Sequence, residues 1–116
     1  MAPSLRTPAW SSRSSAPKGQ EGDQLQHLRG DIDEIDRQLV DLLGQRMSVC
    51  REMGRYKKER GITVLQADRY KSLLRERMEE AKRCGLSPDA VARFFELIHE
   101  ESIRQQLAIV NGDPLA

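Results

Sequence analysis

A regular pattern of apolar residues between Leu25 and Tyr56 constrains the fold more than any other feature of this sequence. The apolar side chains recur in alternating steps of four and three residues, the heptad spacing of helices that pack along one another. Acidic residues crowd the first turns, basic residues crowd the last, and Gly61 follows, as the helix dipole and a glycine helix stop favour. The pattern predicts one helix over roughly residues 24–60. Its apolar stripe consists of Leu28, Ile32, Ile35, Leu39, Leu42, Val49, Met53 and Tyr56.

Two shorter helical patterns follow the long one. The second starts near Ala67 and stops at Gly85. The third has a clear start, because Ser87 can accept hydrogen bonds from the first backbone amides and Pro88 suits the first helical turn. No strand-like alternation occurs, so the sequence predicts an all-α, three-helix fold.

The first helix is too long for the rest of the chain to cover. At the α-helical rise of about 1.5 Å per residue it extends on the order of 55 Å, more than a domain of about ninety residues spans. Its apolar stripe therefore needs a second chain. We expect an intertwined homodimer in which two long helices pack along one another.

Composition excludes several classes of protein. The 116 residues suffice for one small domain, and 19 Lys and Arg against 18 Asp and Glu give a net charge of +1, unlike a nucleic-acid polycation. No stretch approaches the ~20 apolar residues of a membrane span. Cys50 and Cys84 lie far apart without CxxC spacing, which argues against a disulfide scaffold or a zinc site and favours a reducing, cytoplasmic location.

The first 23 residues differ in composition from the rest. They are rich in Ser, Pro, Ala and Gly and contain no acidic residue before Glu21. We expect a disordered tail over 1–23, with an organelle transit peptide as the alternative. The folded domain is then expected over 24–111, followed by a short C-terminal tail over 112–116.

Several polar residues lie where the pattern calls for apolar ones. Arg46 continues the stripe after Leu42, and Lys57 lies eleven residues on, close to three turns, on nearly the same face. In the third helix, Ser102 and Gln106 are one turn apart on one face. Inward cations and neutral donors on different helices predict a cavity that binds a small dianion, with no covalent step. The alternative is that the cations pair with nearby carboxylates and the amides lie on the surface.

The segments LRGDIDEIDRQLVDLLGQRM, GRYKKERG, VLQADRY and GLSPDAVARFFELIHEESIRQQ, in this order, resemble the all-helical (AroQ-type) chorismate mutase family. The similarity extends over about residues 25–110. It implies an intertwined helical dimer with two identical active sites, each of which receives one arginine from the other subunit. Arg29 occupies the position of that crossing arginine.

The resemblance also implies roles for the polar residues of the predicted cavity. Arg46 and Lys57 match the cations that hold the substrate carboxylates, and Arg69 matches the arginine that opens the second helix. Ser102 and Gln106 match the donors of the third helix, with Gln106 and Lys57 placed at the ether oxygen of the enolpyruvyl group. The implied reaction is the intramolecular Claisen rearrangement of chorismate to prephenate in aromatic amino acid biosynthesis, which needs no cofactor and no metal.

Three positions depart from the family pattern. Tyr70 and Gln66 replace acids that face the substituent at C4 of the ring; both can hydrogen-bond a hydroxyl, which favours chorismate. A mutase of 4-amino-4-deoxychorismate and an isochorismate-pyruvate lyase are alternatives. His99 replaces an apolar residue and is expected to face solvent, with a place at the edge of the site as the alternative. A non-catalytic helical dimer module is disfavoured, because burying Arg46 in its seam would cost stability.

Overall fold

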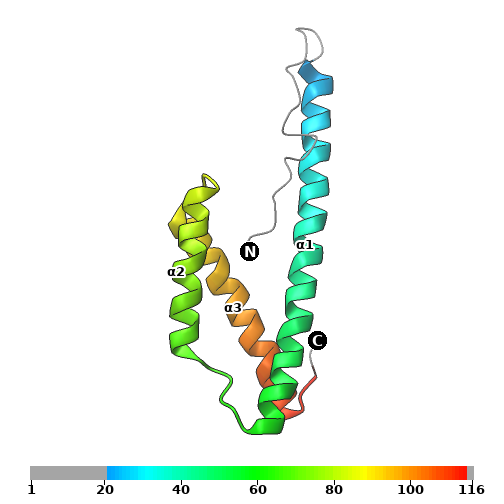
Figure 1. The fold of residues 1–116 in the computed structure, drawn as a ribbon. Helices are drawn as coiled ribbons and strands as arrows, with labels where there is room; N and C mark the ends of the chain where they lie inside the picture. Colours follow the sequence, from blue (N-terminus) through cyan, green and yellow to red (C-terminus); the bar gives the residue numbers. More distant parts are fainter. Residues whose placement is uncertain (1–20, 115–116) are drawn as a thin grey trace. The chain divides into compact units, whose positions relative to one another are not determined.

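The computed structural model describes residues 21–114, which form three helices joined by two short loops (Figure 1). Helix α1 spans Glu21–Arg60, α2 spans Ala67–Arg83 and α3 spans Pro88–Asn111. No strand occurs among these described residues, and the all-α prediction is confirmed. Residues 1–20 of the predicted N-terminal tail and residues 115–116 of the C-terminal tail lie outside the described part of the chain.

The helix ends follow the local sequence signals. The backbone reverses after α1 at Gly61 and after α2 at Gly85, where φ is 66° and 71°, a left-handed conformation that costs other residues steric strain. The Ser87 hydroxyl accepts a hydrogen bond from the backbone N–H of Ala90 at 3.3 Å, and Pro88 is the first residue of α3. The predicted stop and start signals therefore operate as expected. Only the beginning of α1 differs, since the helix starts three residues before the expected residue 24.

Contacts divide the chain into two units, with the boundary inside α1 after Leu43. In the described part of the first unit, the apolar stripe of α1 is exposed on the single chain; for example, Ile32 is 56% exposed and Leu42 is 61% exposed. Leu28 and Leu39 of the stripe are exposed as well, whereas Ile35 is half-buried. A long apolar stripe that is exposed on one chain is typical of a surface on which another helix packs.

The second unit contains the remaining turns of α1 together with α2 and α3. Helices α2 and α3 run antiparallel beside each other (Figure 1). The last turns of α1 bind α3 through side chains: Arg51 Nη1 donates to Gln105 Oε1 at 2.8 Å, and Lys58 Nζ donates to the backbone carbonyl of Ile109 at 3.3 Å. The buried apolar residues are Met47, Cys50, Val64, Ala81, Ile98 and Ala108.

The buried face of α1 in this unit is not the predicted stripe but the face beside it. Val49, Met53 and Tyr56 stay about half exposed. The buried positions are Met47, Cys50, Gly54 and Lys57, which also recur in steps of three and four residues. Helix α3 packs on this second face, so within a few turns α1 has one face that α3 covers and one apolar face that stays about half exposed. None of the three described helices is long and apolar enough to cross a membrane.

Candidate active site

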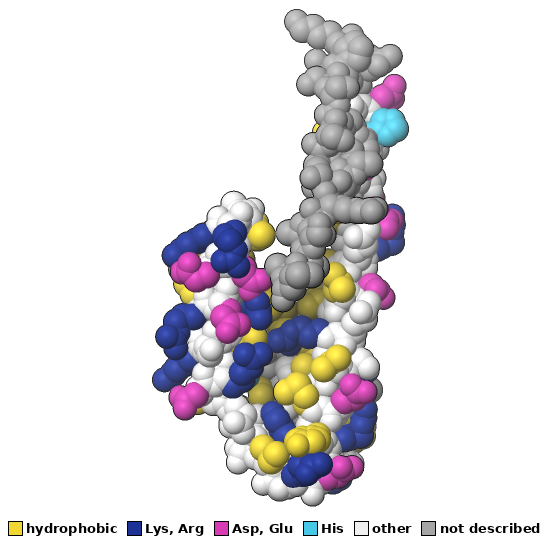
Figure 2. Space-filling model, viewed as in Figure 1, with side chains coloured by type: hydrophobic (Ala, Val, Ile, Leu, Met, Phe, Trp, Pro, Cys, Tyr) yellow, Lys and Arg dark blue, Asp and Glu magenta, His cyan; other side chains and the backbone are white. Residues whose placement is uncertain are grey.

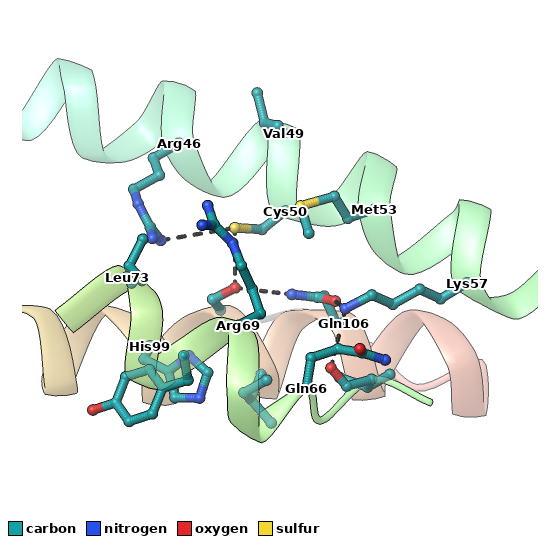
Figure 3. A pocket seen from close by; sticks show the side chains of 14 residues that line it. Arg46, Val49, Cys50, Met53, Lys57, Gln66, Arg69, Leu73, His99 and Gln106 are labelled. Atoms are coloured by element: carbon teal, nitrogen blue, oxygen red, sulfur yellow. Dashed lines mark hydrogen bonds between the residues drawn. The ribbon is translucent and has the colours of Figure 1, made fainter. Parts of the chain in front are cut away.

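A cavity of about 520 Å³ lies within the second unit and draws side chains from all three helices (Figure 3). Seven of the eight predicted site residues line it, which leaves out only Arg29. The seven are Arg46, Lys57, Gln66, Arg69, Tyr70, Ser102 and Gln106; the other lining residues are Val49, Cys50, Met53, Val64, Leu73, His99 and Ile103.

Lys57 reaches the cavity from the last turn of α1. Its side chain is buried, and Nζ donates to Gln106 Oε1 at 2.8 Å and to the backbone carbonyl of Val64 at 3.0 Å. An ammonium group has three protons, so one N–H of Lys57 is left for a ligand. Burial lowers the pKa of Lys57, and the nearby Cys50 thiol opposes part of that shift.

Gln106 is the most deeply buried polar residue of the site, with 3% of its surface exposed. Its Oε1 accepts from Lys57, while its Nε2 donates to Ser102 Oγ at 2.9 Å. An amide nitrogen carries two protons, so one N–H also remains for a ligand. Gly54 of α1 faces this residue, and a Cβ at position 54 would lie only 3.2 Å from Gln106 Cα. The absence of a side chain at Gly54 lets α1 and α3 approach each other at the site.

Ser102 and Cys50 form the buried floor of the same network. Ser102 Oγ donates to Cys50 Sγ at 3.0 Å, and both side chains are 6% exposed. Cys50 was not predicted to line the site, because its spacing from Cys84 argued only against a disulfide scaffold or a zinc site. Its position four residues after Arg46, and so one turn further on the same helix face, was the available signal.

Two arginines complete the cationic lining. Arg46 is half-buried, with Nη1 3.9 Å from Cys50 Sγ and its guanidinium carbon 6.0 Å from the centre of the Phe95 ring. Arg69 lies in the first turn of α2, with an exposed side chain that reaches the cavity (Figure 3). Among residues 22–114, Arg46, Lys57 and Arg69 form no ion pair with a carboxylate. The alternative in which local carboxylates neutralise Arg46 and Lys57 is therefore wrong.

Tyr70 and His99 stack on one another where α2 meets α3. Their ring centres are 3.9 Å apart and their planes differ by 17°. The preferred prediction that His99 faces solvent is wrong: the ring is half-buried and lines the cavity, because Tyr70 packs over it. Burial, together with the positive charges of Arg46 and Lys57, lowers the pKa of His99, which is therefore neutral at pH 7.

Tyr70 is also affected by its surroundings: burial and the nearby carboxylates of Glu96 and Glu100 raise its pKa. Its phenol group is therefore protonated at pH 7 and can donate a hydrogen bond. Gln66 is exposed at the cavity rim, where its Nε2 donates to the backbone carbonyl of Thr63 at 2.9 Å. Both residues offer uncharged polar atoms to a ligand.

The electrostatic character of the cavity follows from this lining. Its ionised groups are three cations, Arg46, Lys57 and Arg69, and no Asp or Glu is among the lining residues that the structure describes. Figure 2 shows Lys and Arg side chains among hydrophobic ones on the face drawn there. No group of three or more metal-ligating side chains gathers within the described residues. The arrangement suits a small ligand with an apolar body and two anionic groups.

Arg29 lies in the N-terminal unit and is exposed, and it does not line the cavity of its own chain. Its predicted role in the site of another subunit therefore stays a prediction.

The sequence of this chain is similar to those of several known proteins. A profile of the family described as chorismate mutase type II matches residues 28–107. The T-protein of Enterobacter agglomerans is 33% identical over 79 residues, which cover 68% of this chain and 21% of that protein. The T-protein of Haemophilus influenzae is 30% identical over 78 residues, with 67% and 21% covered. The chain thus spans about a fifth of the length of these two relatives.

A third relative has a length similar to that of this chain. The 4-amino-4-deoxychorismate mutase of Streptomyces venezuelae is 27% identical over 96 residues, which cover 82% of this chain and 92% of the relative.

Proposed function

The chain belongs to the chorismate mutase type II family, and we propose that it converts chorismate into prephenate. Chorismate is a small dianion, with one carboxylate on its ring and one on the enolpyruvyl side chain. The cationic lining of the cavity supports its binding, since Arg46 and Arg69 can each donate two parallel hydrogen bonds to a carboxylate. The cavity volume of about 520 Å³ is in the range of small-molecule sites.

The proposed reaction breaks the ether C–O bond of chorismate while a C–C bond forms within the same molecule. No proton is transferred and no group leaves, so catalysis consists of holding a compact conformer and stabilising the negative charge that grows on the ether oxygen. Lys57 supplies a fixed positive charge and Gln106 supplies a neutral N–H donor.

The observation that carries this proposal is the contact between Lys57 and Gln106. Nζ and Oε1 are 2.8 Å apart, both side chains are buried, and each group keeps one N–H for a ligand. Two buried donors beside each other can both stabilise charge that develops on one oxygen atom.

The proposal includes a homodimer in which Arg29 completes the cavity of the partner subunit. The exposed apolar stripe on the N-terminal unit supports the dimer, because a second copy would cover it. A fourth cation would add to the affinity for a dianion.

The experiment is to incubate the purified chain with chorismate, isochorismate and 4-amino-4-deoxychorismate in parallel and to identify the products by chromatography. We expect prephenate from chorismate. Lys57→Ala should lower kcat/KM on the order of a hundredfold or more, because it removes a charge that the transition state needs. Lys71→Ala is the matched control, since Lys71 is exposed and does not line the cavity.

One observation favours a second candidate, the mutase of 4-amino-4-deoxychorismate. The relative of that name matches this chain over 92% of its own length. Turnover of the amino compound without turnover of chorismate would establish this second function and reject the first. Release of pyruvate from isochorismate would identify a lyase instead.

A further inference from the structure

A chain of hydrogen bonds links α1 to α3 below the cavity. Lys57 Nζ donates to Gln106 Oε1 at 2.8 Å, Gln106 Nε2 donates to Ser102 Oγ at 2.9 Å, and Ser102 Oγ donates to Cys50 Sγ at 3.0 Å (Figure 3). All four side chains are at most 9% exposed. Water therefore has little access to replace any of these bonds, and the orientation of each group depends on its protein neighbours.

The donor-to-acceptor direction of these hydrogen bonds is set by the two end residues, Lys57 and Cys50. Lys57 can only donate, so it requires the oxygen of the Gln106 amide on its side. At the other end, the single proton of the Ser102 hydroxyl goes to the sulfur of Cys50, which leaves the oxygen lone pairs for Gln106 Nε2. Both ends therefore select the same orientation of the amide. Its second N–H is then fixed in space for a ligand.

Without an acceptor at position 50, the Gln106 amide would be held in this orientation by Lys57 alone. A Ser102 hydroxyl with no partner on α1 is free to rotate and to turn its own proton toward Gln106, where it competes with the amide N–H. The sulfur also accepts from Arg46 Nη1 at 3.9 Å, so the same atom contacts one of the two arginines of the cavity. An apolar side chain of similar size would fill the space without making either contact.

We propose that Cys50 is a positioning residue for the reaction: its sulfur fixes the Ser102 hydroxyl, and through Ser102 it holds the Gln106 amide in the orientation that presents one N–H to the substrate beside Lys57. This inference rests on the proposed function, because its readout is the rate of that reaction. It assigns Cys50 no contact with the reacting atoms and no covalent step.

The test begins with Cys50→Ala and Cys50→Ser, assayed with chorismate under steady-state conditions. Cys50→Ala should lower kcat by about three- to tenfold, the equivalent of one neutral hydrogen bond, and should change KM less. Cys50→Ser should recover most of the lost kcat, because a hydroxyl oxygen also accepts a hydrogen bond. Cys84→Ala is the matched control: this second cysteine is exposed, does not line the cavity and should leave both constants unchanged.

A double-mutant cycle separates positioning from a general loss of packing. If Cys50 acts through Ser102, then adding Cys50→Ala to Ser102→Ala should cost no further kcat. Additive losses would overturn the proposal, and so would a Cys50→Ala enzyme with unchanged kcat. If Cys50→Ala does not fold, as judged by circular dichroism, Cys50→Val fills the space without an acceptor and must show the same three- to tenfold fall in kcat.

The outcomes distinguish this inference from the proposed function. Lack of turnover by both the wild-type chain and Cys84→Ala would reject both proposals. Turnover by these two chains, combined with wild-type kcat in Cys50→Ala, would reject the positioning role alone.

Discussion

The buried ammonium of Lys57 gives the proposed reaction a defined dependence on pH. Burial lowers its pKa, so the group loses its proton at a pH below the ordinary lysine value of about 10.4. Because the protonated form is the one that stabilises the ether oxygen, we expect kcat/KM to fall on the alkaline side with a midpoint below that value. A pH–rate profile from pH 7 to 10.5 measures this limb.

Lys57→Arg is the control for this assignment. A guanidinium stays charged over the whole range, so the variant should show a lower but flat profile. An alkaline limb that persists unchanged in Lys57→Arg would assign the titration to another group.

His99 gives a second pH effect, on stability rather than rate. Its folded-state pKa is lowered by burial and by Arg46 and Lys57, so the unfolded chain binds more protons than the folded chain below about pH 6.5. Stability should therefore fall as the pH drops from about 6.5 toward the folded pKa and should recover as the pH rises. Melting curves of the wild type and of His99→Gln between pH 5 and 7.5 test this, and equal slopes for the two proteins would contradict it.

Several polar residues of the cavity gave a signal in the sequence, because they interrupt an apolar pattern or lie at helical spacing from a residue that does. The structure places Arg46, Lys57, Ser102 and Gln106 in the lining of one cavity, and their roles there stay predictions. Cys50 was not predicted, since a buried cysteine fits an apolar pattern and gives no signal of a hydrogen-bonding role. The position of His99 depends on the Tyr70 ring from another helix, and such a contact between segments distant in the chain leaves no periodic trace in the sequence.

At the level of the helices, the bounds were predictable because caps and glycine stops are local signals. The face on which α3 packs was not, because α1 has two sets of positions at helical spacing. The heptad positions are the apolar ones, whereas the set that α3 covers includes Gly54 and Lys57, residues that a hydrophobic pattern does not register. A glycine inside a predicted helix was the signal for this close approach.

Gly54→Ala tests that close approach. The new Cβ would lie 3.2 Å from Gln106 Cα, closer than ordinary van der Waals contact, so α3 must shift by a few tenths of an ångström at a residue that lines the cavity. We expect kcat/KM to fall on the order of tenfold or more, because small displacements of positioned groups are costly for catalysis. Steady-state kinetics with chorismate and a melting curve measure the two effects.

Gly44→Ala is the matched control in the same helix. An added Cβ at Gly44 meets nothing within 4 Å. The substitution should leave the rate unchanged and raise the free energy of unfolding by roughly 0.5–1 kcal/mol, the difference between alanine and glycine inside a helix. Equal rates for the Gly54 and Gly44 variants would show that the approach of α1 to α3 does not position Gln106.

For the whole molecule, two features bear on whether the protein is a dimer. They are the apolar stripe on the N-terminal unit and the cavity in the C-terminal unit. Most of the stripe is exposed on the single chain, and the residues that line the cavity all belong to the C-terminal unit. In the proposed dimer, a second copy covers the stripe and Arg29 enters the cavity of the partner subunit. This dimer also makes a prediction that no arrangement of separate subunits shares.

That prediction is rescue between two inactive variants. Arg29→Ala and Lys57→Ala should each lose on the order of a hundredfold in rate. Refolded together, they form mixed dimers in which one site carries both defects and the other carries neither. About a quarter of the wild-type activity should return if half of the dimers are mixed. The measurement is prephenate formation after refolding of equal amounts, with sedimentation to establish that dimers form.

The matched control is a mixture of Arg46→Ala with Lys57→Ala. Both residues line the cavity of one chain, so every site in a mixed dimer keeps one defect and no activity should return. Rescue in the first mixture and none in the second requires Arg29 to act across the subunit interface. If the first mixture is no more active than its better parent while mixed dimers are present, Arg29 acts within its own chain or not at all, and the shared site is rejected.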